Sequence, residues 1–183
     1  SFSLPLFFSP SNFPKKMSKV FFAAVASAAV LTAQPSSART IFPKPLRQTD
    51  DASALDLPID QTNFQFSAAK SSPTNDILEN AFNRYYAIAL GQSAGSNENI
   101  VDAASGPVTG LEVTLDTGDT SLTLETNVSY TLKVSAPTIT LSAQNVYGAL
   151  NGLESFSQLV GSHGTINGTY IEDNPRYQFR ATM

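Results

Sequence analysis

Residues 148–160 read Gly148-Ala149-Leu150-Asn151-Gly152-Leu153-Glu154-Ser155-Phe156-Ser157-Gln158-Leu159-Val160, and this stretch predicts an amphipathic helix that packs closely on a sheet. Its apolar residues recur every three or four positions and so share one face of a helix. Asn145 can cap the start of the helix and Gly161 can end it. Gly148 and Gly152 each cost about 1 kcal/mol relative to alanine in a helix. We expect both glycines to let the helix approach the sheet closely.

Three stretches before this helix predict strands with one apolar and one polar face. They are residues 111–115, 130–134 and 138–141, where apolar and polar side chains alternate. Ala136-Pro137 separates the last two and predicts a hairpin. Such alternation is typical of a sheet that is covered on one face only. After the helix, residues 166–171 predict a last short hairpin that turns at Asn167-Gly168.

The residues before these strands predict one further strand and one further helix. Residues 63–68 alternate like a strand, and Ser72-Pro73 predicts a helix start, with serine as the N-cap and proline at the first position. Gly91 is the expected end of that helix. Residues 41–58 hold three prolines and are expected to be irregular, and residues 93–110 are expected to form a loop. The element order predicts an α+β fold, a mostly antiparallel sheet with two helices on one face.

The composition excludes several classes of function. Hydrophobic residues make up 42% of the 183 residues, which is enough for a packed core, and the net charge is −4. There is no basic stripe that would suit a nucleic acid, so we expect no nucleic-acid partner. The sequence has no cysteine, and its single histidine, His163, lies in a Gly-rich stretch. One histidine cannot make a zinc site alone, and we expect neither a metal nor a cofactor.

Residues 17–38 predict a secretory signal peptide. A short basic start precedes the apolar run of residues 20–31, and Ser36-x-Ala38 fits the small-x-small pattern of a cleavage site. Cleavage before Arg39 is expected, and cleavage after Ala33 is the alternative. The apolar run is shorter than the about 20 residues that a membrane span needs, so we expect no stable membrane span.

Three motifs together carry a family resemblance. Residues 148–160 are similar to G-A-L-R-G-L-E-T-F-S-Q-L, with Asn151 in place of arginine and Ser155 in place of threonine. Residues 129–134 are similar to a strand pattern E-S-Y-x-L-x-V, and residues 171–180 to I-x-D-x-P-R-F-x-H-R. In this order the motifs resemble the N-terminal part of the family 20 glycoside hydrolases, the β-N-acetylhexosaminidases. The resemblance covers roughly residues 40–183 and implies a zincin-like α+β domain before a catalytic barrel.

The resemblance implies substrate-assisted hydrolysis, in which the 2-acetamido oxygen of the sugar attacks the anomeric carbon. A glutamate serves as general acid/base and a neighbouring aspartate orients the acetamido group, both inside a barrel of about 250 residues. This sequence has no Asp-Glu pair, and Glu172-Asp173 has the reverse order. We therefore assign no catalytic residue to this chain and expect it to be inactive by the family mechanism.

One substrate-binding residue is implied by the third motif. Arg180 occupies the place of the family arginine that hydrogen-bonds hydroxyls of the terminal sugar, a role that suits the planar guanidinium. Phe179 and Ala181 depart from the histidine and glycine of the family pattern. In this chain alone Arg180 is expected to be solvated, and in a longer parent enzyme it is expected to bind sugar. Arg176 is interpreted as a structural residue at the domain junction.

Two N-glycosylation sequons lie beside predicted turns. They begin at Asn127 and Asn167. Asn167-Gly168 is equally an ordinary hairpin turn. Together with the signal peptide, the sequons predict a glycoprotein of the secretory pathway, and they leave open an extracellular, lysosomal or vacuolar destination.

The expected organisation has four parts. Residues 1–16 are interpreted as upstream sequence, 17–38 as the signal peptide, 39–174 as the N-terminal domain, and 175–183 as the truncated start of a (β/α)8 barrel. The expected function is that of the front part of a β-N-acetylhexosaminidase, whose barrel binds a glycan and removes its terminal N-acetylhexosamine. The alternative is a self-standing, non-catalytic secreted domain that binds a glycan or another partner. The sequence leaves open whether the protein forms a homo-oligomer.

Overall fold

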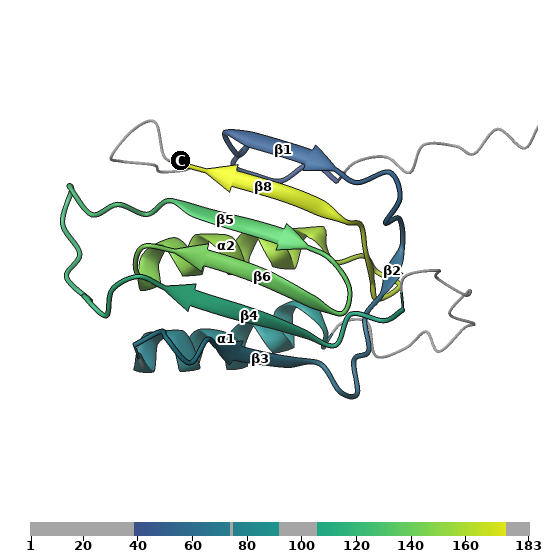
Figure 1. Ribbon diagram of the computed structural model, residues 1–183, viewed down its shortest axis with the longest axis horizontal. Coiled ribbons are helices and arrows are strands. Elements are labelled where there is room, and N and C mark those ends of the chain that lie inside the picture. Colours follow the sequence, from purple (N-terminus) through teal and green to yellow (C-terminus); the bar gives the residue numbers. More distant parts are fainter. Residues whose placement is uncertain (1–38, 74, 92–105, 175–183) are drawn as a thin grey trace, which may run out of the picture. The chain divides into compact units, whose positions relative to one another are not determined.

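The computed structural model describes residues 39–73, 75–91 and 106–174 (Figure 1). The expected signal peptide and the stretch before it lie outside these residues. The described elements are β1 (Arg47–Asp50), β2 (Leu57–Pro58), β3 (Gln65–Ala68), α1 (Asp76–Ala89), β4 (Gly110–Leu115), β5 (Tyr130–Val134), β6 (Thr138–Ala143), α2 (Val146–Leu159), β7 (Thr165–Ile166) and β8 (Thr169–Asp173).

Six of the strands form one mixed sheet in the order β1-β8-β5-β6-β4-β3. The strand β4 runs parallel to both of its neighbours, β3 and β6, and the other three ladders are antiparallel. The strands β2 and β7 form a separate short antiparallel ladder. Both helices lie on the same face of the large sheet (Figure 1). The predicted α+β fold with two helices on one face is confirmed.

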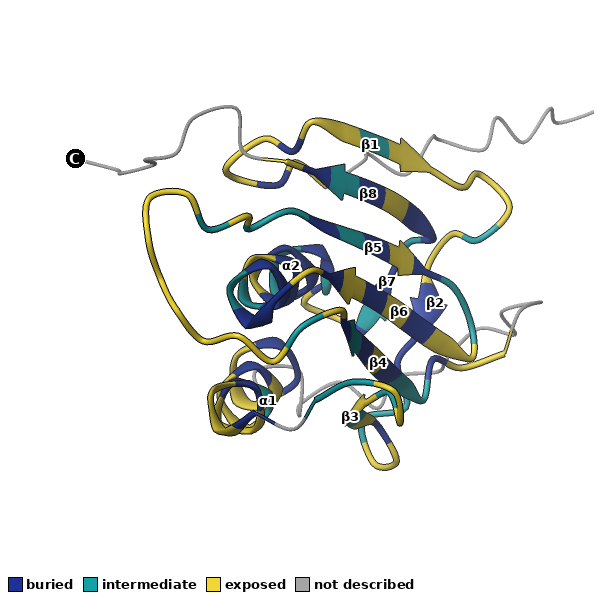
Figure 2. Cartoon of the chain, turned by 60° about the vertical axis from the view of Figure 1, so that its left-hand side comes forward, coloured by how far each residue is buried: buried dark blue, intermediate teal, exposed yellow. Residues whose placement is uncertain are grey.

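The core lies between the sheet and the two helices. Along β4, β5, β6 and β8, buried and more exposed residues alternate, so that one face is apolar and the other polar (Figure 2). The apolar face carries buried residues such as Leu132, Leu141 and Ile171, while Glu112 and Lys133 lie on the open face. The alternation follows from the two-residue repeat of a strand. It is the pattern that the sequence predicted.

The helix α2 is capped and packed as its sequence predicts. The Asn145 side chain accepts hydrogen bonds from the backbone N–H groups of Tyr147 and Gly148, both at 3.1 Å. A Cβ atom at Gly148 would lie 2.5 Å from the backbone oxygen of Ser129, and one at Gly152 would collide with a methyl group of Leu141. Both glycines therefore permit the close approach of the helix to the sheet.

An aromatic cluster joins the two helices to strand β3. Phe156 of α2 is fully buried, stacks on Phe64 and meets Phe66 edge-on, each with ring centroids 5.9 Å apart. On the other side of Phe66 lies Phe82 of α1, stacked at 5.4 Å. Such contacts add to the hydrophobic effect of burying the rings. Phe156 is thus at the centre of the core.

The predicted start of the first helix was wrong by one turn. The helix α1 begins at Asp76, and its N-cap is Asn75, whose side chain accepts a hydrogen bond from the N–H of Ile77 at 2.8 Å. Ser72 has a different partner, because its hydroxyl accepts a hydrogen bond from the N–H of Leu115 at 2.8 Å. The serine therefore satisfies a donor at the end of β4 instead of capping the helix.

Two further expectations were wrong, again because a contact with a distant part of the chain decided the local structure. Residues 41–58 are not wholly irregular, because they contain β1 and β2, which pair with β8 and β7. The predicted hairpin at Asn167-Gly168 does not form, since β7 pairs with β2 instead of β8. The N–H of Gly168 donates to the carbonyl of Ala54 at 2.6 Å. Residues 47–58 thus take the place that a local hairpin partner would have.

Candidate functional site

The polar side of helix α2 links three segments of the chain. Tyr85 of α1 donates its hydroxyl proton to a carboxylate oxygen of Glu154 at 3.1 Å. Gln158, one turn further, donates to the other oxygen of Glu154 at 3.2 Å. The same amide donates to the carbonyl of Phe42 and accepts from its N–H, both at 2.8 Å. Glu154 and Gln158, two polar residues of the 148–160 motif, thus link the two helices to each other and to Phe42.

The environment of Tyr85 favours its protonated form. Burial raises the pKa of the Tyr85 hydroxyl, and the negative charge and hydrogen bond of Glu154 raise that pKa further. The guanidinium of Arg84, which lies 5.0 Å from the ring centroid, acts in the opposite direction and more weakly. Tyr85 is therefore a structural hydrogen-bond donor. Its hydroxyl keeps its proton and donates it to Glu154, so it is poorly placed to act as a base.

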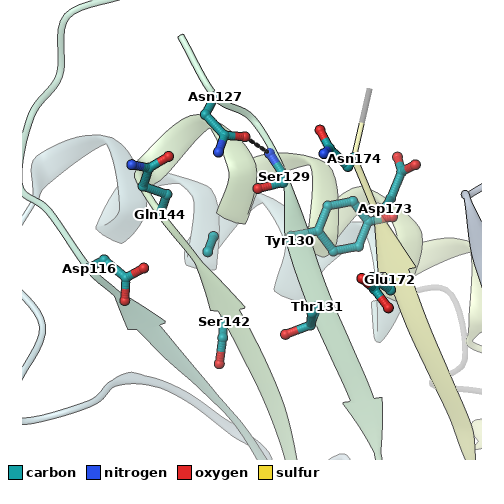
Figure 3. Close-up of a pocket in the computed structure, with 11 residues that line it drawn as sticks. Asp116, Asn127, Ser129, Tyr130, Thr131, Ser142, Gln144, Glu172, Asp173 and Asn174 are labelled. Atoms are coloured by element: carbon teal, nitrogen blue, oxygen red, sulfur yellow. Dashed lines mark hydrogen bonds between the residues drawn. The ribbon is translucent and has the colours of Figure 1, made fainter. Parts of the chain in front are cut away.

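A polar hollow of about 460 Å³ lies at one end of the sheet, where β4, β6 and β8 end and β5 begins (Figure 3). The residues around it come from both the strand ends and the connections that follow. Its lining consists of Asp116, Asn127, Ser129, Tyr130, Thr131, Ser142, Ala143, Gln144, Glu172, Asp173 and Asn174. The side chains of Thr131, Ser142 and Glu172 lie on the open, polar face of the sheet, so the hollow opens on the side away from the helices.

The two adjacent carboxylates in this hollow do not form an acid/base pair. Neighbouring residues of a strand point to opposite faces, so Glu172 and Asp173 diverge. Asp173 is only 5% exposed and accepts a hydrogen bond from the N–H of Leu46 at 3.1 Å. That contact fastens residue 46, just before β1, to the end of β8. Within the described ranges, no group of three or more metal-ligating side chains is gathered.

Arg180, which was predicted to bind sugar, and Arg176, which was interpreted as a structural residue at the domain junction, both lie outside the described residues. The two sequon asparagines lie at opposite ends of the sheet, one before β5 and the other before β8. Asn127 is exposed, and its side-chain oxygen accepts from the N–H of Ser129 at 3.0 Å. Asn167 is half-buried, and its side-chain oxygen accepts from the N–H of Asp56 at 2.8 Å.

Sequence reasoning missed the contacts of Glu154 and Gln158. Their spacing of four residues on a helix places both side chains on one face, which is the signal that could have linked them to each other. Their other partners, Tyr85 and Phe42, are 69 and 116 residues away. No spacing rule could have identified those two.

The profile of the family described as "beta-acetyl hexosaminidase like" matches residues 41–159, which include both helices and every strand of the large sheet except β8. The chain belongs to this family. The human β-hexosaminidase subunit β is 35% identical over 171 residues, which is 88% of this chain and 30% of that protein. The subunit β of the pig, Sus scrofa, is 33% identical over 81% of this chain and 29% of its own length.

The fold agrees with that of a solved hexosaminidase-family structure. A chitobiase of Flavobacterium johnsoniae superposes with a TM-score of 0.58, at 22% identity, over 75% of this chain and 21% of its own. The chain thus spans about 30% of the length of the curated hexosaminidases it matches. In the described part of this chain, no helix is both long and apolar enough to cross a membrane.

Proposed function

We propose that this chain is the N-terminal, non-catalytic domain of a β-N-acetylhexosaminidase that removes terminal N-acetylhexosamine residues from glycans. The observation that carries the proposal is the family match over residues 41–159, which contains the complete helix α2 and its contacts. The relatives are more than three times the length of the matched region, which agrees with a catalytic domain outside it. The described residues supply a packed scaffold and no acid/base pair.

The reaction chemistry suggests which role belongs to the catalytic barrel and which to the present domain. In substrate-assisted hydrolysis the sugar supplies its own nucleophile, the acetamido oxygen, and the enzyme supplies a proton donor and an orienting carboxylate. We assign that donor and that carboxylate to a barrel that follows residue 174. Arg180 would hold hydroxyls of the terminal sugar through its fork of N–H groups. The contribution of the present domain is to fix the start of the polypeptide that enters the barrel, through β8 and its buried Asp173.

We propose that the signal peptide is cleaved before Arg39, where the described contacts of the domain begin. The Arg39 guanidinium donates to the carbonyl of Val160 at 3.5 Å, its own carbonyl accepts from Gln48 at 3.2 Å, and Ile41 is buried in the core. A mature chain that begins at Arg39 keeps all of these contacts, as does one that begins at Gln34. From the predicted signal peptide and the two sequons, we propose that the protein enters the secretory pathway and that Asn127 and Asn167 carry N-linked glycans.

The test is an extended enzyme and a pair of variants. Extension of the reading frame beyond Met183 should yield a protein that hydrolyses an aryl N-acetylglucosaminide. In it, Arg180→Ala should lower kcat/KM by roughly 10- to 100-fold, the worth of a hydrogen bond to a charged group. Arg84→Ala, on the exposed side of α1, is the control and should leave kcat/KM unchanged. An inactive extended protein would contradict the proposal, and unchanged kinetics in Arg180→Ala would remove the assigned sugar contact.

A further inference from the structure

The connection between β4 and β5, residues 116–129, is long and yet firmly held. Connections in compact domains have a median length of about 4–6 residues. At its start, the N–H of Thr117 donates a hydrogen bond to the carbonyl of Gln144, the residue after β6, at 2.9 Å. Its middle is held by Tyr147 of α2, whose hydroxyl donates to the carbonyl of Thr120 at 2.8 Å, and its end by Asn145, whose amide donates to the carbonyl of Asn127 at 2.6 Å. The loop therefore has a defined shape.

Two large apolar side chains of this loop point into solvent. Leu122 is 65% exposed and Leu124 is 68% exposed, and neither belongs to the hydrophobic core or packs against it. Leu124 lies in a tight turn, in which the N–H of Thr126 donates to the carbonyl of Thr123 at 3.2 Å. Such turn positions usually carry glycine, proline or small polar residues. Single exposed leucines are ordinary, but two within three residues of an ordered loop form a small apolar patch that the fold of this domain does not need.

The patch lies at the end of the domain where the described chain leaves the sheet. Asp173, the last residue of β8, pairs with Tyr130, the first residue of β5, which directly follows the loop. Asn174 shares the lining of the polar hollow with Asn127 and Ser129, which form the base of the loop (Figure 3). Any polypeptide that continues from residue 174 therefore begins beside this loop.

We infer that Leu122 and Leu124 are the docking contact of this domain for the domain that follows residue 174. The inference rests on the proposed function, since the occupant is the catalytic domain of the same polypeptide. The position of the loop beside the chain exit favours this occupant, because the polypeptide that continues from residue 174 starts next to the loop. Burial of two leucine side chains there would fix the orientation of the two domains, which the main-chain connection alone does not.

The test uses the absence of cysteine from the chain. Leu122→Cys and Leu124→Cys each place one thiol on the patch, and Leu55→Cys places a matched thiol at a 42% exposed leucine between β1 and β2, at the opposite end of the sheet. Each variant is prepared in the 183-residue chain and in the extended enzyme. The rate of labelling by N-ethylmaleimide is measured at the introduced residue by peptide mass spectrometry.

We expect all three thiols to react at similar rates in the 183-residue chain. In the extended enzyme, labelling at positions 122 and 124 should slow by at least about tenfold, the effect of burying the one leucine that remains in each variant, and labelling at position 55 should not change. Fast labelling at 122 and 124 in an active extended enzyme would overturn the docking contact and leave the proposed function standing. An extended protein without hexosaminidase activity would overturn both. Protection in the 183-residue chain that grows with protein concentration would show that a second copy covers the patch, and would also overturn the inference.

Discussion

The substitution Phe156→Ala tests the packing on which the domain depends. Phe156 of α2 is fully buried and contacts the rings of Phe64 and Phe66. Truncation of a buried phenylalanine to alanine costs about 3–5 kcal/mol, because transfer energy is lost and a cavity remains. The free energy of unfolding of a domain is about 5–15 kcal/mol in total. For a domain of this size, the loss corresponds to a fall in Tm of roughly 10–20 °C.

The measurement is urea unfolding of residues 39–183, followed by circular dichroism and by tyrosine fluorescence. Coincident transitions would justify a two-state free energy. Phe82→Ala is the matched control, because Phe82 stacks on Phe66 and is only partly buried. We expect Phe82→Ala to cost less than Phe156→Ala. A loss below about 1 kcal/mol for Phe156→Ala, or a larger loss for Phe82→Ala, would refute the description of the core.

Three further results are expected. Gly148→Ala should destabilise the domain by about 1–3 kcal/mol in urea unfolding, since the new methyl meets a backbone oxygen, while Gly152→Ala, whose methyl meets a leucine side chain that can move, should cost less. Above the ordinary tyrosine pKa of about 10, the unfolded state releases the Tyr85 proton before the folded state does, so the free energy of unfolding falls as the pH rises. In Tyr85→Phe, the fall of Tm with pH in thermal unfolding should be shallower than in the parent protein. An identical slope would contradict the raised pKa. In a eukaryotic secretion host, Asn127→Gln and Asn167→Gln should each remove one glycan from the secreted protein on a gel, and no mobility change in either would count against the secretory proposal.

The local elements of the fold could be predicted because their signals are local. The apolar stripe and the cap at Asn145 define α2, and the alternation of residues 130–134 defines β5. The strand β1 could not be predicted, because it forms only by pairing with residues of β8 more than a hundred positions later. The start of α1 was misplaced because Ser72 has a tertiary partner in β4 that competes with the cap. Each error arose where a distant contact decided the local structure.

In the candidate site, too, local features could be predicted from the sequence and contacts between distant residues could not. The close packing at Gly148 and Gly152 of α2 could be predicted from the sequence, because a glycine inside a helix is unfavourable unless a close neighbour requires it. The roles of Glu154 and Gln158 depended on Tyr85 and Phe42, which no spacing rule connects to them. The expectation for Arg180 came from the resemblance alone and stays a prediction.

The most direct test of the central proposal is an assay of the 183-residue chain on an aryl N-acetylglucosaminide, with the extended enzyme as positive control. General acid/base assistance contributes about 10²–10⁴-fold to such reactions, and we assign the acid/base that provides it to the domain that follows residue 174. We expect the 183-residue chain to release no aryl alcohol above the blank, while the extended enzyme turns over. Turnover by the purified 183-residue chain, at a rate that follows its concentration, would contradict the non-catalytic assignment.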